Sequence, residues 1–257
     1  MPLGKIKVAY VKFNITQAIK VWIENGGTTK FPKSLKQVLK YIQNDPNITN
    51  MKEAAYLLAT AKGESDFSLE RWESDYVCGP VGQAYDKQPC DAALNYYRAT
   101  RTSSGKSKRN YYDLGVDKNG LPYFGCGLIQ LTGKSNYEKY SRIIGVDLVN
   151  DGDKALIPKN SYKIASAYLA NKTFKHVNNG DLTRARKSVN GGTFGLDHIN
   201  KSFERWMTVF QSPKVKFKSA SFSKTTRTIL MASGISVGVF SFIMFILPST
   251  NIRLERK

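Results

Sequence analysis

The chain has 257 residues, with 39 Lys and Arg against 20 Asp and Glu, so its formal net charge at pH 7 is +19. Hydrophobic residues make up 41% and aromatic residues 12%, which excludes a wholly disordered chain, because such chains lack the apolar surface that offsets the entropy of ordering. The charge indicates an anionic partner: nucleic acid, acidic lipid or an anionic cell-wall polymer. Three Cys and two His residues do not suit the usual zinc sites, so we expect no metal and no cofactor.

Helical periodicity is the main local signal in the first 211 residues. We treat residues 1–33 as an N-terminal extension, with a short strand at Lys7–Phe13. Residues 34–43 repeat apolar side chains at the i, i+3, i+4 and i+7 positions of an amphipathic helix. A second helix is expected to begin at Asn50, with Glu53 as its reciprocal capping partner. Further helices are predicted at residues 136–144, 161–170, 181–189 and 196–210.

A long irregular region separates the second and third predicted helices. Residues Cys78–Phe124 are rich in Gly, Tyr, Asn and Lys. Long loops in compact domains are usually functional or mobile, so we interpret this one as a substrate-cleft insertion; the alternative is a surface insertion without a role. Cys78 and Cys90 could form a disulfide in an oxidising compartment and would stay thiols in a reducing one.

The C-terminal segment has a different composition. The 25 residues 228–252 carry no charge, and we expect residues 228–248 to form a transmembrane helix; a buried core helix is the alternative. A basic linker, residues 212–227, precedes this segment, and a short basic tail, residues 249–257, follows it. Linker and tail hold eight Lys and Arg and one Glu, a net charge of +7, which leaves +12 on the preceding residues. We expect the linker to lie near anionic lipid headgroups.

Two carboxylates near the end of the second helix are candidates for acid and base. Glu64 falls near the apolar side at the helix C-terminus, where desolvation and the helix dipole both disfavour the charged form, as a general acid requires. Glu73 follows nine residues later, with Glu70 close by. One protonated and one ionised carboxylate are the minimum equipment for glycoside hydrolysis. The spacing by itself fits a solvated acidic surface equally well.

A motif further along the chain favours the catalytic interpretation. Tyr123–Tyr137, YFGCGLIQLTGKSNY, resembles the signature of glycoside hydrolase family 19, which includes chitinases and related phage and bacterial endolysins and is usually written Y-x-G-R-G-x-x-Q-L-T/S-x-x-x-N-Y. Residues 54–65, 146–156 and 189–192 are similar, in order, to other landmarks of that family. The resemblance implies a mainly α, two-lobed lysozyme-like fold with a long cleft loop. We assign residues 34–211 to this catalytic domain.

The resemblance also implies roles for individual residues. Glu64 matches the general acid, and Glu73 matches the general base that activates water, with Glu70 as the alternative. Thr132 stands where the family has the Ser or Thr that helps to hold this water. The implied reaction is inverting hydrolysis of a β-1,4 bond between N-acetyl sugars, in which the two carboxylates are about 6.5–9.5 Å apart.

Three amide side chains match residues that hydrogen-bond the sugars in the family: Gln130, Asn136 and Asn190. Each has a structural alternative. Gln130 could satisfy a backbone group in a predicted strand at Gly127–Leu131, Asn136 could be a helix N-cap, and Asn190 could be a turn residue with left-handed geometry. Tyr123 and Tyr137 are expected in the core or the cleft wall.

The chain departs from the family pattern at two positions. Gly63 replaces the His before the acid, and Cys126 replaces the Arg of the G-R-G sequence. We expect Cys126 to be a buried thiol. Neither position is the proton donor or the base, so the departures leave two hypotheses: an active hydrolase, and a catalytically impaired glycan-binding or assembly protein of a membrane-containing virion.

The resemblance leaves two candidate substrates, peptidoglycan and chitin. The net charge of +12 outside the C-terminal segment favours peptidoglycan, which carries anionic peptides, over neutral chitin. We therefore expect a lysozyme-type enzyme that also binds the lipid bilayer through its C-terminal helix, in a bacterial envelope or the internal membrane of a phage particle. Nucleic acid is the least expected partner, because the aromatic residues are not interleaved with the basic ones in a binding motif.

Overall fold

The computed structural model describes residues 10–71, 118 and 123–220, and this part of the chain is mainly helical, as predicted. Glu73, Cys78, Cys90, most of the predicted cleft insertion and the predicted transmembrane segment, residues 228–248, lie outside the described residues. None of the helices that the structure describes has both the length and the apolar character needed to cross a membrane.

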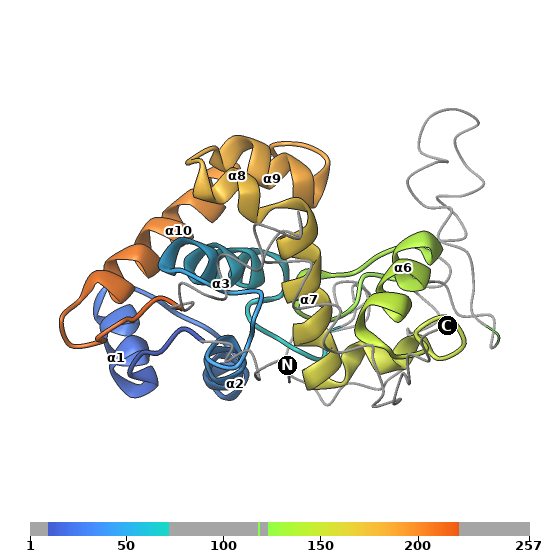
Figure 1. The fold of residues 1–257 in the computed structure, drawn as a ribbon, viewed down its shortest axis with the longest axis horizontal. Helices are drawn as coiled ribbons and strands as arrows, with labels where there is room; N and C mark the ends of the chain where they lie inside the picture. The colour runs from blue at the N-terminus through green and yellow to red at the C-terminus, as the bar shows by residue number, and fades with distance from the viewer. Residues whose placement is uncertain (1–9, 72–117, 119–122, 221–257) are drawn as a thin grey trace, which may run out of the picture.

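The central element is helix α3 (Met51–Ser65), which lies among the other helices (Figure 1) and is buried on every side from Glu53 to Ala61. Its start agrees with the sequence: the Oδ1 atom of Asn50 accepts a hydrogen bond from the backbone N–H of Glu53. The Glu53 carboxylate accepts from the backbone N–H and the hydroxyl of Thr49, one residue before the predicted partner. Neighbouring elements pack against every face of this stretch because its side chains are small or apolar. The fully buried ones are Ala54, Ala55, Tyr56, Leu57, Leu58, Ala59 and Ala61.

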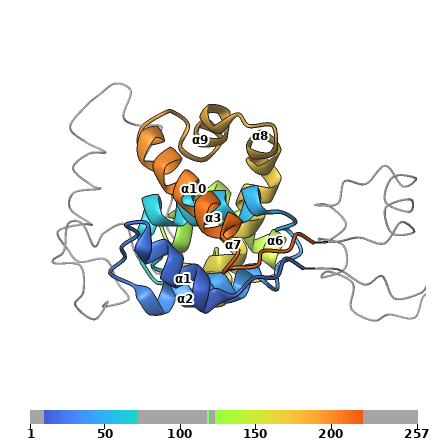
Figure 2. The ribbon, with the colours of Figure 1, turned by 90° about the vertical axis from the view of Figure 1, so that its left-hand side faces the viewer.

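The other helices surround α3. Helix α10 packs along it, α8 and α9 lie on one side, and α1 and α2 lie on the other, as Figures 1 and 2 both show. Helix α7 crosses beside this group and separates it from α6. The helix bounds are α1 (Ile15–Glu24), α2 (Pro32–Ile42), α6 (Lys134–Ile144), α7 (Pro158–Lys172), α8 (Phe174–Asn178), α9 (Leu182–Asn190) and α10 (Leu196–Gln211), with short 3-10 helices η1 (Gly127–Ile129) and η2 (Gly152–Leu156).

Helix α1 (Ile15–Glu24) lies within residues 1–33, the predicted N-terminal extension. The side chain of Asn14 caps it by accepting from the backbone N–H of Gln17. Its buried face includes Trp22, whose ring stacks on that of Trp206 in α10 with 5.4 Å between centroids. Phe67 meets both indole rings edge-on. Residues 15–24 are therefore part of the core.

Neither predicted strand is formed as such in the described residues. Residues 7–9 of the expected strand at Lys7–Phe13 lie outside the described part, and the rest of it makes a single bridge between Lys12 and Lys218. The expected strand at Gly127–Leu131 is the 3-10 helix η1, because the backbone φ angles of Gly127 (70°) and Gln130 (53°) are incompatible with an extended chain.

The first part of the predicted basic linker packs against the domain. Val215 is fully buried, and the ring of Phe217 stacks on Phe13 with 5.6 Å between centroids. The backbone N–H of Ala220 donates to the carbonyl of Thr49. A free tether therefore does not begin at Ser212.

Candidate active site

Glu64 lies in the last turn of α3 and forms an ion pair with Arg186 of α9. The Nη1 atom of Arg186 donates to the Oε1 atom of Glu64 over 2.5 Å. The side chains are 21% exposed for Glu64 and 7% exposed for Arg186, so the carboxylate reaches solvent while the guanidinium is buried.

The charge of Glu64 reaches two tyrosines. Burial, and to a smaller extent the negative charge of Glu64, raises the pKa of Tyr168 in α7 above its ordinary value. Burial also raises the pKa of Tyr56 in α3; Arg186 opposes this shift and Glu64 adds to it. Both phenols are therefore neutral at physiological pH.

Asn190 lies at the end of α9, four residues after Arg186. Its Nδ2 atom donates to the carbonyl oxygen of Phe194 over 3.4 Å, and the Nε atom of Arg186 donates to the same oxygen over 2.9 Å. Gly191 then ends the helix with a left-handed conformation (φ 71°). The turn residue predicted at Asn190 is thus realised one position later, and Asn190 helps to hold the loop beside Glu64.

The three predicted site residues of the signature motif support one another. Gln130 adopts a left-handed conformation, and its side-chain amide donates to the carbonyls of Gly127 (2.8 Å) and Arg71 (3.1 Å). The hydroxyl of Thr132 donates to the carbonyl of Gln130, and the amide of Asn136 donates to the carbonyl of Thr132. Asn136 is not the N-cap of α6, because the cap residue is Gly133. The Thr132 oxygen retains lone pairs that can accept from a water.

The fold brings this motif to the end of α3 that carries Glu64. The hydroxyl of Ser65, the next residue, donates to the carbonyl of Leu128 in η1 over 2.9 Å. Gln130 follows two residues later and also holds the carbonyl of Arg71, in the segment that leaves α3. The described residues thus place the candidate acid and the motif in one region. The predicted base, Glu73, is outside the description, and the alternative, Glu70, is exposed.

Both departures from the family pattern are filled by local packing. A Cβ atom on Gly63 would lie 2.6 Å from the Cδ1 atom of Ile199 in α10, so Ile199 occupies the space that a side chain would need. Cys126 is buried, and the hydroxyl of Tyr137 lies 2.7 Å from its Sγ atom and donates to the carbonyl of Phe124. Tyr123 and Tyr137 are both buried, as expected for core residues.

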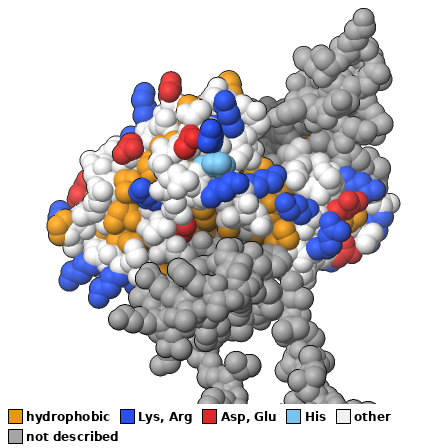
Figure 3. Space-filling model, turned by 45° about the horizontal axis from the view of Figure 1, so that its top comes forward, with side chains coloured by type: hydrophobic (Ala, Val, Ile, Leu, Met, Phe, Trp, Pro, Cys, Tyr) orange, Lys and Arg blue, Asp and Glu red, His pale blue; other side chains and the backbone are white. Residues whose placement is uncertain are grey.

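Sequence reasoning missed Arg186. It is 122 residues from Glu64 along the chain and stands in a basic stretch, Arg184–Lys187, of a chain with 39 basic residues. In the structure Arg186 follows directly on Ala185 in α9, and both side chains are buried. The only trace of this in the sequence is the position of Arg186 next to Ala185. Most of the neighbouring cations point to solvent, and Figure 3 shows a row of Lys and Arg side chains across the face that contains α8 and α9.

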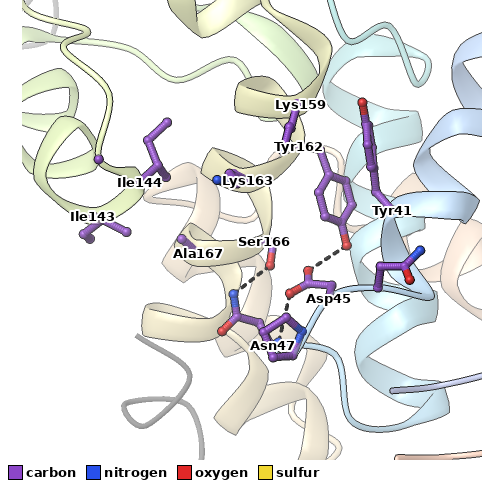
Figure 4. Close-up of a pocket in the computed structure, with 13 residues that line it drawn as sticks. Tyr41, Asp45, Asn47, Ile143, Ile144, Lys159, Tyr162, Lys163, Ser166 and Ala167 are labelled. Carbon is purple, nitrogen blue, oxygen red and sulfur yellow. Dashed lines mark hydrogen bonds between the residues drawn. The ribbon is translucent and has the colours of Figure 1, made fainter. Parts of the chain in front are cut away.

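A hollow of about 320 Å³ lies beyond the N-terminal end of α3, away from Glu64. Tyr41 and the α2–α3 loop form one wall, and α7 and the end of α6 form the other (Figure 4). Its polar groups bind one another: the Tyr162 hydroxyl donates to Asp45 over 2.7 Å, and the amide of Asn47 donates to the hydroxyl of Ser166. None of the predicted site residues lines it.

Comparison with known proteins gives a limited set of similarities. No protein-family profile matches the chain. The chain is 25% identical over 185 residues to a glycosyl hydrolase family 19 domain-containing protein of Haemophilus influenzae, covering 69% of this chain and 91% of that protein. Among solved structures it is similar to chitinase C from Streptomyces griseus (TM-score 0.49, 16% identity) and to a point mutant of chitinase C (TM-score 0.49, 15% identity), covering 79% of this chain and 94% of each. The sequence relative carries the name of the family that the motifs resemble, which supports a glycoside hydrolase.

Proposed function

We propose that the protein is a glycoside hydrolase that cleaves β-1,4 bonds between N-acetyl sugars by an inverting mechanism. The observation that carries the proposal is the half-buried Glu64, which ends the central helix beside the motif containing Gln130 and Thr132. The similarity to the Haemophilus influenzae protein supports the same reaction class. Glu64 donates a proton to the leaving oxygen, and Glu73, or Glu70 in its place, activates the attacking water.

The charge of the chain favours peptidoglycan as the substrate. The residues before the C-terminal segment carry a net charge of +12, and basic side chains lie on the face that holds α8 and α9 (Figure 3). Chitin is neutral and gains nothing from this charge, whereas peptidoglycan carries anionic peptides. Mass analysis of the products from purified peptidoglycan tests substrate and bond together: reducing-end muropeptides are expected, and release of sugars from chitin alone would contradict the choice.

A glycan-binding protein without turnover is the second candidate. Gly63 and Cys126, which replace two family residues, favour it. Two observations oppose this second candidate. Ile199 fills the space beside Gly63, and the hydroxyl of Tyr137 forms a hydrogen bond with the Sγ atom of Cys126, so neither replacement leaves a gap beside Glu64 or in the motif. Retention of the protein on peptidoglycan without release of any soluble fragment would favour this second candidate.

We further propose that residues 228–248 anchor the protein in a membrane, either of a bacterial envelope or inside a phage particle. The uncharged composition of residues 228–252 supports an anchor. The charged residues that flank it, Arg227 and Arg253, suit the two membrane surfaces. Fractionation tests this: the full chain should stay with membranes until detergent is added, and a chain ending at residue 220 should not. Recovery of the full chain in the detergent-free soluble fraction would contradict the anchor.

A further inference from the structure

Phe194 is the most exposed large apolar side chain among the described residues. It stands in the loop between α9 and α10 and is 86% exposed, against 59% for Ile23 and 50% for Ile157. Single exposed apolar residues are common and need no explanation by themselves. The surroundings of this one are what distinguish it.

The backbone of Phe194 is held in place from both sides. Its carbonyl oxygen accepts hydrogen bonds from Arg186 and Asn190. The loop is bounded by two glycines in left-handed conformations, Gly191 (φ 71°) and Gly195 (φ 73°), and Gly195 starts α10. The backbone of this loop is therefore fixed while the aromatic side chain projects into solvent, so little backbone entropy is lost when the ring binds a ligand.

The group that fixes Phe194 also binds the candidate acid. Arg186 donates through Nε to the Phe194 carbonyl and through Nη1 to the Glu64 carboxylate, so one guanidinium joins the two residues. A planar fork with several donors can bridge two acceptors in this way, and it fixes the relative position of both. The backbone that carries the exposed ring is therefore linked to the candidate catalytic carboxylate through a single buried side chain.

We propose that the ring of Phe194 is a platform on which one pyranose ring of the N-acetyl sugar polymer stacks, near the bond that Glu64 cleaves. A pyranose has an apolar face of C–H groups and a rim of hydroxyl and amide groups. The apolar face covers the aromatic ring and removes its surface from water. This inference rests on the proposed function, because it assumes that the polymer occupies the region of Glu64.

The test is binding to insoluble peptidoglycan and to chitin, with the full chain in detergent and the Glu64→Gln substitution present in every sample to prevent turnover. Adding Phe194→Ala should weaken binding by roughly fivefold to tenfold, and Phe194→Trp should retain or improve it. Ile23→Ala, which removes an exposed apolar side chain from α1, is the matched control and should leave binding unchanged. In the parent enzyme, Phe194→Ala should raise KM with little effect on kcat.

The outcomes separate this inference from the proposed function. If the Glu64→Gln protein binds glycan and Phe194→Ala binds it equally well, the stacking platform is wrong and the proposed function stands. If the Glu64→Gln protein binds neither polymer, both are wrong. Because Phe194 is exposed, all variants should unfold at the same temperature, and a lower melting temperature for Phe194→Ala with normal binding by Phe194→Ala also contradicts the platform.

Discussion

A carboxylate lies near each end of helix α3, and the two carboxylates differ in exposure and in the groups that bind them. Beyond the N-terminal end, Asp45 is 5% exposed and accepts from the hydroxyl of Tyr162 and the backbone N–H of Asn47. At the C-terminal end, Glu64 is 21% exposed and is paired with the buried cation of Arg186. The helix rises 1.5 Å per residue, so the two sites are about 20 Å apart.

The difference shows which carboxylate is available for chemistry. Burial raises the pKa of Asp45, and neutral donors from the protein occupy it, so it belongs to the structure of the hollow. Glu64 keeps a solvent-exposed part, and its partner is the charged side chain of Arg186. A catalytic acid needs an oxygen that the substrate can reach, and of these two carboxylates only Glu64 offers one.

The largest expected effect comes from removing the carboxylate at the Glu64 end. Glu64→Gln keeps the size of the side chain and loses the proton donor, so hydrolysis of peptidoglycan should fall by about 10²–10⁴-fold. Zymography and release of soluble fragments measure the loss. The matched change at the other end, Asp45→Asn, should leave activity close to that of the parent protein. Equal clearing by Glu64→Gln and the parent would remove Glu64 from the mechanism.

The second effect concerns Arg186, the buried cation that is present at the Glu64 end of α3 and has no buried counterpart beside Asp45 among the described residues. Arg186→Gln should destabilise the fold by about 1–3 kcal/mol, less than for a fully buried pair because Glu64 is partly exposed. Urea denaturation measures the loss, and Arg184→Gln, an exposed neighbour in α9, is the control. Equal stability of the Arg186→Gln and Arg184→Gln proteins would show that the ion pair with Glu64 does not stabilise the fold.

The third effect tests whether the Asp45 end is structural. Tyr162→Phe leaves the buried carboxyl without one of its donors and should lower the free energy of unfolding by about 1–3 kcal/mol, measured by urea denaturation. Activity of the folded variant should be unchanged. Tyr41→Phe removes a hydroxyl that accepts a hydrogen bond from the half-buried Gln37, a partner in contact with solvent, so its cost should be smaller. Lost activity without lost stability would instead give the hollow a functional role.

The smallest effect is a dependence of stability on pH. Burial raises the pKa of Asp45 above its ordinary value, so the folded protein binds this proton more tightly than the unfolded chain. The contribution of Asp45 to stability is therefore full below the ordinary carboxyl range and declines as the pH rises through the raised pKa. Asp45→Asn should lack this decline in thermal melts from acid to neutral pH.

Asp147 provides a control of opposite sign. Hydrogen bonds from Asn150 hold its pKa below the usual value, so its contribution is lost as the pH falls. Asp147→Asn should therefore reduce the loss of stability on the acid side. If Asp45→Asn and Asp147→Asn change the pH dependence in the same direction, burial does not control the Asp45 proton.

The local sequence determined most of the helices. The apolar repeat of residues 34–43 corresponds to α2 (Pro32–Ile42), and the cap at Asn50 starts α3 as predicted. The periodicities of residues 161–170 and 196–210 correspond to α7 and α10 within a few residues at each end. These elements were predictable because helix caps and the 3.6-residue repeat depend on neighbours within one or two turns.

The tertiary structure alone decided how the candidate site is arranged. The sequence identified Glu64 and the motif containing Gln130, but it did not indicate that Arg186 pairs with Glu64 or that Ile199 fills the space beside Gly63. In the sequence, any of the basic residues around Arg186 could pair with Glu64, and any apolar residue of a predicted helix could pack beside Gly63. The packing of α9 and α10 against α3 selects Arg186 and Ile199, because burial makes one pairing far more favourable than its alternatives.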